Sequence, residues 1–118
     1  MNIQDTLNDL LTVDGAMCAA VVDAQSGMML GQAGTGIDLE IAAAGNTEVV
    51  RAKLKTMKSL KLTDVIEDIL ITLGKQYHII RPIAKSNDIF LYFVLDKSKS
   101  NLALARRKLQ DAEAGIEL

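Results

Sequence analysis

The segment Ile37–Leu60, with the sequence IDLEIAAAGNTEVVRAKLKTMKSL, decides how the rest of the chain is interpreted. It is free of proline, and Asp38 stands where a side chain can accept hydrogen bonds from the first unpaired N–H groups of a helix. We therefore predict a helix over Ile37–Leu60, the longest element of the chain.

Projected at about 100° per residue, this helix has three faces. One face is bulky and apolar and is predicted to lie on a sheet; it consists of Leu39, Ala43, Val50, Leu54 and Met57. A polar face is predicted to be solvated; it consists of Glu40, Thr47, Glu48, Arg51, Lys55 and Lys58. The third face, here called the small-residue stripe, is nearly uncharged; it consists of Ile41, Ala42, Gly45, Val49, Ala52 and Thr56.

The small-residue stripe needs an explanation, because the surface helix of a monomer requires only one apolar face. Gly45 costs about 1 kcal/mol of helix propensity relative to alanine, which indicates a packing reason for it. One interpretation is that the stripe contacts another helix of the same chain, or that alanine simply favours a helix. The other is a homodimer in which this helix packs antiparallel on its symmetry mate. We predict the homodimer.

The segments before the central helix predict a helix and a hairpin. Ile3, Leu7, Leu10 and Leu11 have amphipathic helical spacing, and Asn2 with Asp5 suits the first turn. Two strands follow, over Ala16–Ala24 and Met28–Gln32. The connection Asp23–Gly27 is a turn in which Gly27 can adopt a positive φ, and the next stretch, GQAGTG, is predicted to be a loop.

The segments after the central helix predict three strands and a last helix. The strands are Asp64–Leu73, Gln76–Ile83 and Ile89–Leu95, and a two-residue Gly74-Lys75 turn joins the first pair. Pro82 removes a ladder donor, so we expect a bulge or an unpaired stretch there. Ser98 or Ser100 is expected to cap the last helix, whose apolar face consists of Leu102, Ala105, Leu109 and Ala112.

The predicted order is α-β-β-α-β-β-β-α within one domain over residues 1–118. Hairpins and short connections indicate an α+β fold with a five-stranded antiparallel sheet that is covered by helices. The strand Asp64–Leu73 is predicted to be an edge of this sheet that pairs across a two-fold axis, because its apolar run would otherwise be an exposed edge that invites aggregation.

Composition excludes several classes of function. Of 118 residues 49% are apolar, only two Tyr and two Phe are aromatic, and the net charge is −2, which argues against a nucleic-acid partner. Cys18 is the single cysteine, so no intramolecular disulfide forms, and no apolar run is long enough to span a membrane. The start of the chain lacks a basic signal region. We expect a cytoplasmic protein without membrane insertion.

No catalytic or metal-binding constellation is predicted. His78 is the only histidine, whereas a metal site needs roughly three or four ligands, so we expect no metal and no cofactor. The GQAGTG stretch lacks the Lys-Ser/Thr of a phosphate-binding loop. Arg106, Arg107 and Lys108 are interpreted as a solvated basic face. Glu67 and Asp68 are adjacent on a predicted strand and would point to opposite faces.

The pattern as a whole resembles the roadblock/dynein light-chain family. The resemblance runs over about Ile3–Asp111 and includes the hairpin GAMCAAVVDAQSGMML, the alanine-rich central helix and the final IFLYFVLDKSKSNLALARRKL. The chain is most similar to the bacterial stand-alone members, of the kind that includes the gliding-motility GTPase activator. The motifs are patterns of size and polarity, and the VVD…SG hairpin is the nearest to a signature.

The resemblance implies a profilin-like sheet between helices and a dimer through the central helix and the third strand. The expected interface consists of Ile41, Ala42, Gly45, Val49, Ala52, Thr56, Val65, Ile66, Asp68 and Leu70. It also implies a non-catalytic scaffold or regulator that binds a Ras-like small GTPase. The polar face of the central helix supplies the expected contacts, Glu48, Arg51 and Lys55. Arg51 is the best placed for an arginine finger, but no catalytic role is assigned to it. A structural or adaptor subunit and a small-molecule sensor domain are the alternatives.

Overall fold

The computed structural model of the chain describes residues 1–86 and 88–118. The elements in chain order are α1 (Ile3–Leu10), β1 (Ala16–Asp23), β2 (Met29–Gly34), α2 (Leu39–Ser59), β3 (Ile69–Thr72), β4 (Gln76–Pro82), β5 (Ile89–Asp96), the 3-10 turn η1 (Lys97–Lys99) and α3 (Leu102–Gly115). The predicted order of helices and strands is confirmed. None of the helices among these residues is long and apolar enough to cross a membrane.

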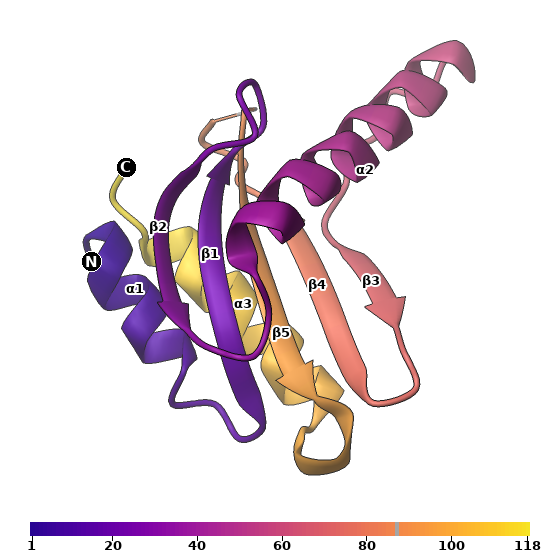
Figure 1. The fold of residues 1–118 in the computed structure, drawn as a ribbon. Helices are drawn as coiled ribbons and strands as arrows, with labels where there is room; N and C mark the ends of the chain where they lie inside the picture. Colours follow the sequence, from indigo (N-terminus) through magenta and orange to yellow (C-terminus); the bar gives the residue numbers. More distant parts are fainter. Residues whose placement is uncertain (87) are drawn as a thin grey trace.

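The five strands form one antiparallel sheet in the order β2-β1-β5-β4-β3. Figure 1 shows β2 and β3 at opposite margins of the sheet and α2 crossing one face of it, with α1 and α3 behind. The predicted five-stranded sheet is confirmed, and so is the prediction that the third strand is a sheet edge.

Helices cover both faces of the sheet, as predicted. Under α2, Leu39, Ala43 and Val50 pack on a buried cluster that consists of Cys18, Ala20, Val22, Ile80, Phe90, Tyr92 and Val94. On the other face, α1 and α3 cover a second buried cluster that includes Leu7, Leu10, Ala19, Val21, Ile79, Leu91, Phe93, Ala105 and Leu109. Because β1 and β5 are central and buried on both faces, their sequences are nearly continuous apolar runs.

Side-chain caps set where the helices α1, α2 and α3 begin. The side chain of Asn2 accepts a hydrogen bond from the N–H of Asp5 at 2.7 Å, and Asp38 caps α2. The prediction that Ser98 or Ser100 caps α3 is wrong, because Asn101 accepts from Leu104 N–H at 3.1 Å. Both serine hydroxyls instead donate to Asp96 and stabilise the η1 turn.

The predicted strand Asp64–Leu73 is shorter than expected, since β3 covers only Ile69–Thr72. Its first pair is Ile69 with Ile80, two residues before Pro82. Because Pro82 has no N–H to donate, the ladder between β3 and β4 has no partner for residues before Ile69. On the β5 side β4 is paired through Pro82 without a register shift. The expected unpaired stretch is therefore present, and the bulge is not.

The stretch GQAGTG is only partly a loop, because Gly31–Gly34 belongs to β2. Gly31 lies where α1 approaches the strand: a Cβ atom there would be 2.6 Å from Cγ2 of Ile3. The glycine therefore marks close packing of a helix on an edge strand. In the sequence alone, such a glycine-rich strand looks like a loop. Gly27 has a φ of 78°, as the predicted hairpin turn requires.

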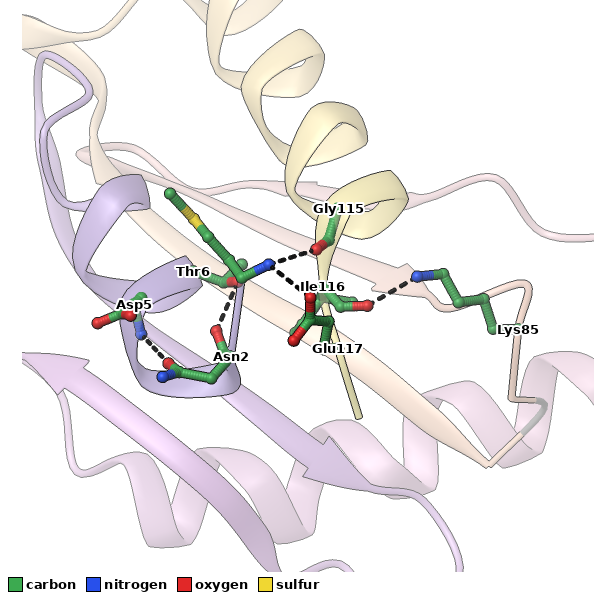
Figure 2. Close-up of polar contacts among 8 residues, drawn as sticks. Asn2, Asp5, Thr6, Lys85, Gly115, Ile116 and Glu117 are labelled. Carbon is green, nitrogen blue, oxygen red and sulfur yellow. Dashed lines mark hydrogen bonds and ion pairs between the residues drawn. The ribbon is translucent and has the colours of Figure 1, made fainter.

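The two ends of the chain are tied together (Figure 2). The amino nitrogen of Met1 donates to the Gly115 carbonyl at 3.0 Å, and Glu117 N–H donates to the Met1 carbonyl at 2.7 Å. Nζ of Lys85 donates to the Ile116 carbonyl at 2.7 Å. These bonds satisfy carbonyl groups at the end of α3 and hold α1 beside it.

Candidate functional site on helix α2 and strand β3

The small-residue stripe of α2 lies on the surface. Ile41 is 73% exposed, Ala42 is half-buried, and the remaining members, Gly45, Val49, Ala52 and Thr56, are exposed. A Cβ atom added at Gly45 would meet no heavy atom within 4 Å. Within residues 1–86 and 88–118 no other helix covers the stripe. The interpretation that it packs on another helix of the same chain is therefore wrong.

The carboxyl-terminal end of α2 extends beyond the strands of the sheet (Figure 1). Leu39, Ala43, Val50 and Met57 are buried as predicted, whereas Leu54 is 45% exposed. Leu54 borders a hollow of about 510 Å³ that is also lined by Val65, Pro82 and Phe90. The prediction that Leu54 lies on the sheet is wrong, because the hollow separates it from the strands and leaves it exposed.

Thr47 is a second correction on this helix. The helical projection predicts it on the solvated face, but only 2% of it is exposed. Its hydroxyl donates to the Ala43 carbonyl at 2.8 Å, so it is buried with its hydrogen bond satisfied. Thr47 lies at the boundary between the apolar and polar faces, and this bond lets it pack toward the sheet.

Within the described residues, strand β3 presents free backbone groups at the sheet edge. The N–H of Leu73 donates to Gln76 O at 2.9 Å, so the odd-numbered residues of β3 direct their backbone groups toward β4. Leu70 and Thr72 lie between them and direct theirs away from the sheet. These are the groups that a further strand would bind.

The segment before β3 divides the predicted interface residues. Val65 is 77% exposed and Ile66 is half-buried, both beside the hollow under α2. Asp68 instead turns toward α3, where its carboxylate accepts from Nε of Arg106 at 2.9 Å and from Nη2 at 2.6 Å. Its side chain is only 9% exposed, so it is engaged within the chain.

Two sequence-based interpretations of these charged groups are corrected by the structure. Arg106 is not simply solvated, and its hydrogen bond to Asp68 raises the pKa of its guanidinium. Glu67 and Asp68 precede β3, so the alternation of a strand does not place them. No local pattern signals a contact between residues 68 and 106, because the fold alone brings them together.

The three predicted partner-binding residues are exposed on the polar face of α2. Nη1 of Arg51 lies 3.7 Å from Oε1 of Glu48, and Nη2 of Arg51 donates to the carbonyl of Gln25 in the turn between β1 and β2. Lys55 makes no ion pair within the described part of the chain. The structure therefore brings Glu48 and Arg51 together, and it gives Arg51 a role in holding the hairpin turn.

A hydrogen-bonded group of polar side chains under α2 was not predicted from the sequence. Nδ1 of His78 lies 2.8 Å from the Tyr92 hydroxyl, and Nε2 lies 2.8 Å from Oε1 of Gln76. Both contacts are satisfied when neutral His78 accepts at Nδ1 and donates from Nε2. Partial burial lowers the pKa of His78 and so favours this neutral form. The i, i+2 spacing of Gln76 and His78 on one strand was the available signal.

The described residues offer no metal site or activated nucleophile. They contain no cluster of three His, Cys, Asp or Glu side chains that could hold a metal ion. Cys18 is buried, and burial raises the pKa of its thiol to about 11, so the thiolate is scarce at neutral pH. What the site offers chemically is an uncharged helix stripe beside an open strand edge.

Comparison with solved structures identifies this arrangement. MglB from Myxococcus xanthus superposes with a TM-score of 0.83 over 95% of this chain and 89% of that chain, at 18% identity. A Roadblock/LC7 domain from Streptomyces avermitilis gives a TM-score of 0.82 over 97% and 93%, at 9% identity. This chain has a Roadblock/LC7 fold.

A second MglB structure has the same fold, whereas comparisons of the sequence find no match. The gliding protein MglB from Thermus thermophilus gives a TM-score of 0.78 over 92% of this chain and 81% of that chain, at 17% identity. No protein-family model and no curated protein matches the sequence. The resemblance inferred from the sequence is thus confirmed through three-dimensional structure, at the level of the fold.

Proposed function

We propose that this chain is a non-catalytic, homodimeric regulator or scaffold that binds a Ras-like small GTPase in the cytoplasm. The observation that carries the proposal is the exposed small-residue stripe of α2 beside the open edge of β3. A helix stripe that no described element covers and a strand with free backbone groups are the two parts that one two-fold interface would use together.

The proposed dimer places α2 antiparallel to its symmetry mate and joins β3 to β3. Gly45 and Ala52 let the two helix backbones approach closely, while Leu70 and Thr72 bind the second strand through their backbone groups. Val65 and Ile66 extend the apolar contact. Asp68 is left out, because Arg106 already binds it. An MglB with the same fold has been solved in a tetrameric arrangement, which supports self-association of this fold.

The GTPase is proposed to bind the polar faces of the paired α2 helices. Glu48, Arg51 and Lys55 lie on this exposed face, and their mixed charges suit the orientation of a partner. The proposal assigns no catalytic residue to this chain, and Arg51 is occupied by Gln25 and Glu48.

Titration of a GTP-loaded Ras-like GTPase tests this surface. Lys55→Glu should weaken binding while leaving the dimer mass and the thermal stability nearly unchanged, because Lys55 makes no ion pair within the described residues. Lys108→Glu, on exposed α3, is the matched control and should bind as the wild type does. Equal affinities of wild type, Glu48→Lys and Lys55→Glu would contradict the proposed surface. If these proteins still had the mass of a dimer, the proposed α2–β3 interface would not be contradicted by that result.

A small-molecule sensor is the second candidate, and the hollow under α2 favours it. The hollow of about 510 Å³ is lined mainly by apolar side chains, with Arg81 and Glu113 among its polar residues. NMR spectra of the isotope-labelled protein, recorded with a library of small apolar acids, would test it. Chemical-shift changes centred on Val50, Leu54 and Phe90 would support a sensor over a GTPase platform.

A further inference from the structure

Strand β2 forms the sheet edge opposite β3, and no charged residue protects it. The chain carries no charge from residue 24 to residue 37, between Asp23 and Asp38. Exposed edges in monomeric proteins usually carry lysine, proline or another device that prevents pairing. Here the edge also presents an apolar side chain, since Leu30 is 47% exposed, and Met28 just before the strand is 68% exposed.

The free backbone groups of this edge belong to identifiable residues. Thr35 N–H donates to Met17 O at 3.1 Å, and Ala33 pairs with Ala19. Alternation along the ladder therefore directs the backbone groups of Gln32 and Gly34 away from the sheet. One of them is occupied: Nε2 of Gln4, on α1, donates to the Gln32 carbonyl at 3.2 Å.

We propose that β2 is a second self-association edge, which pairs antiparallel with β2 of another copy about a two-fold axis at Gln32. This register sets Gln32 opposite Gln32 and Leu30 opposite Gly34. Gly34 has no side chain, so the bulky Leu30 has room beside it, and no like charges face each other.

The surroundings of Gln32 fit this occupant. Ala33 packs in the cluster under α1 and α3, so the Gln32 side chain points to the α2 side. There it borders a hollow of about 470 Å³ together with Leu30 and Glu40. The Gln32 side chain of the second copy would enter this hollow, where the two amide groups can bind each other. A charged peptide bound along β2 would meet no side chain of opposite charge, because residues 24–37 carry none.

Pairing through β2 does not depend on the proposed α2–β3 interface, because the two edges lie on opposite margins of the sheet (Figure 1). If α2 and β3 form a dimer, the β2 edge joins dimers into tetramers and longer rows. If they do not, it joins two single chains. In either case the first step is a doubling of mass as the concentration rises.

A charge-exchange experiment tests the two-fold axis at Gln32. Sedimentation velocity of the wild-type chain, up to the limit of its solubility, should show the doubling step. Gln32→Lys and Gln32→Glu should each weaken that step, by about fivefold, because like charges then face each other across the axis. An equimolar mixture of the two variants should recover it. An interface that keeps the residue-32 side chains of the two copies apart predicts no such recovery.

Gln4→Ala is the second variant, and it should act in the opposite direction. It frees the Gln32 carbonyl from the α1 side chain, so the doubling step should strengthen. No doubling in the wild type at any concentration would assign the edge to some other occupant and overturn the proposal. Doubling that survives both single charges, or that the mixture does not recover, would overturn it as well.

Discussion

The carboxylate of Asp68 accepts both N–H groups that Arg106 directs at it, at 2.9 Å from Nε and 2.6 Å from Nη2. Asp68 stands immediately before the four-residue strand β3, and Arg106 lies in the second turn of α3. The ion pair therefore links the start of β3 to α3, which covers the sheet face opposite α2.

Arg106→Ala should destabilise the fold by removing this tie. Asp68 would then keep a largely buried carboxylate without its partner. The arginine itself is half-exposed, which limits the loss, so we expect the free energy of unfolding to fall by about 1 to 2 kcal/mol. Urea unfolding measures it. Arg107→Ala is the control, since Arg107 is exposed and makes no ion pair within the described residues. Equal stability of the two variants would show that the Asp68–Arg106 pair contributes little.

Gly45→Leu separates the stability of the single chain from its self-association. A Cβ atom at this position would meet no heavy atom of the described residues outside the adjoining helix backbone within 4 Å, and the helix gains about 0.5 to 1 kcal/mol of propensity. At a helix–helix interface the same side chain would overpack and weaken association by about 1 to 3 kcal/mol. Sedimentation equilibrium and thermal unfolding measure the two quantities. A variant that associates as tightly as the wild type would contradict an interface at Gly45.

Amide hydrogen exchange along β3 should distinguish inward from outward residues. The amide of Ile71 faces β4 and should exchange slowly at every concentration, whereas the amides of Leu70 and Thr72 face outward. If β3 pairs with a second copy, these two should become slow as the dimer forms. Rapid exchange at Leu70 and Thr72 in a sample of dimer mass would place the dimer contact elsewhere.

His78 should make stability depend on pH. Burial lowers the pKa of folded His78 below the ordinary value of 6.5, so between these two values the unfolded chain binds more protons. Its contribution is complete above pH 6.5 and is lost as the pH falls toward the folded pKa. Urea unfolding at about pH 7.5 and about pH 5.5 measures this loss. His78→Gln should lose less stability over the same interval, and an identical loss in both proteins would exclude His78 as the cause.

Local patterns were sufficient for the framework of this fold. The helical spacing of Leu7 and Leu10, the cap at Asp38 and the Gly74-Lys75 turn each act over a few residues, so their structures follow from sequence neighbours. The strand limits were less predictable, because the length of β3 depends on Pro82, a residue in the next strand. The position of β2 likewise depends on Ile3 of α1, which packs against Gly31.

The sequence by itself therefore determined the order of elements, the antiparallel sheet with β3 at its edge and the small-residue stripe on α2. Only the tertiary structure decided that this stripe is uncovered, that Leu54 is exposed and that Thr47 is buried. It alone paired Asp68 with Arg106 and His78 with Tyr92. The physical reason is distance along the chain: periodicity determines which way a side chain points, whereas its contacts depend on where remote elements pack.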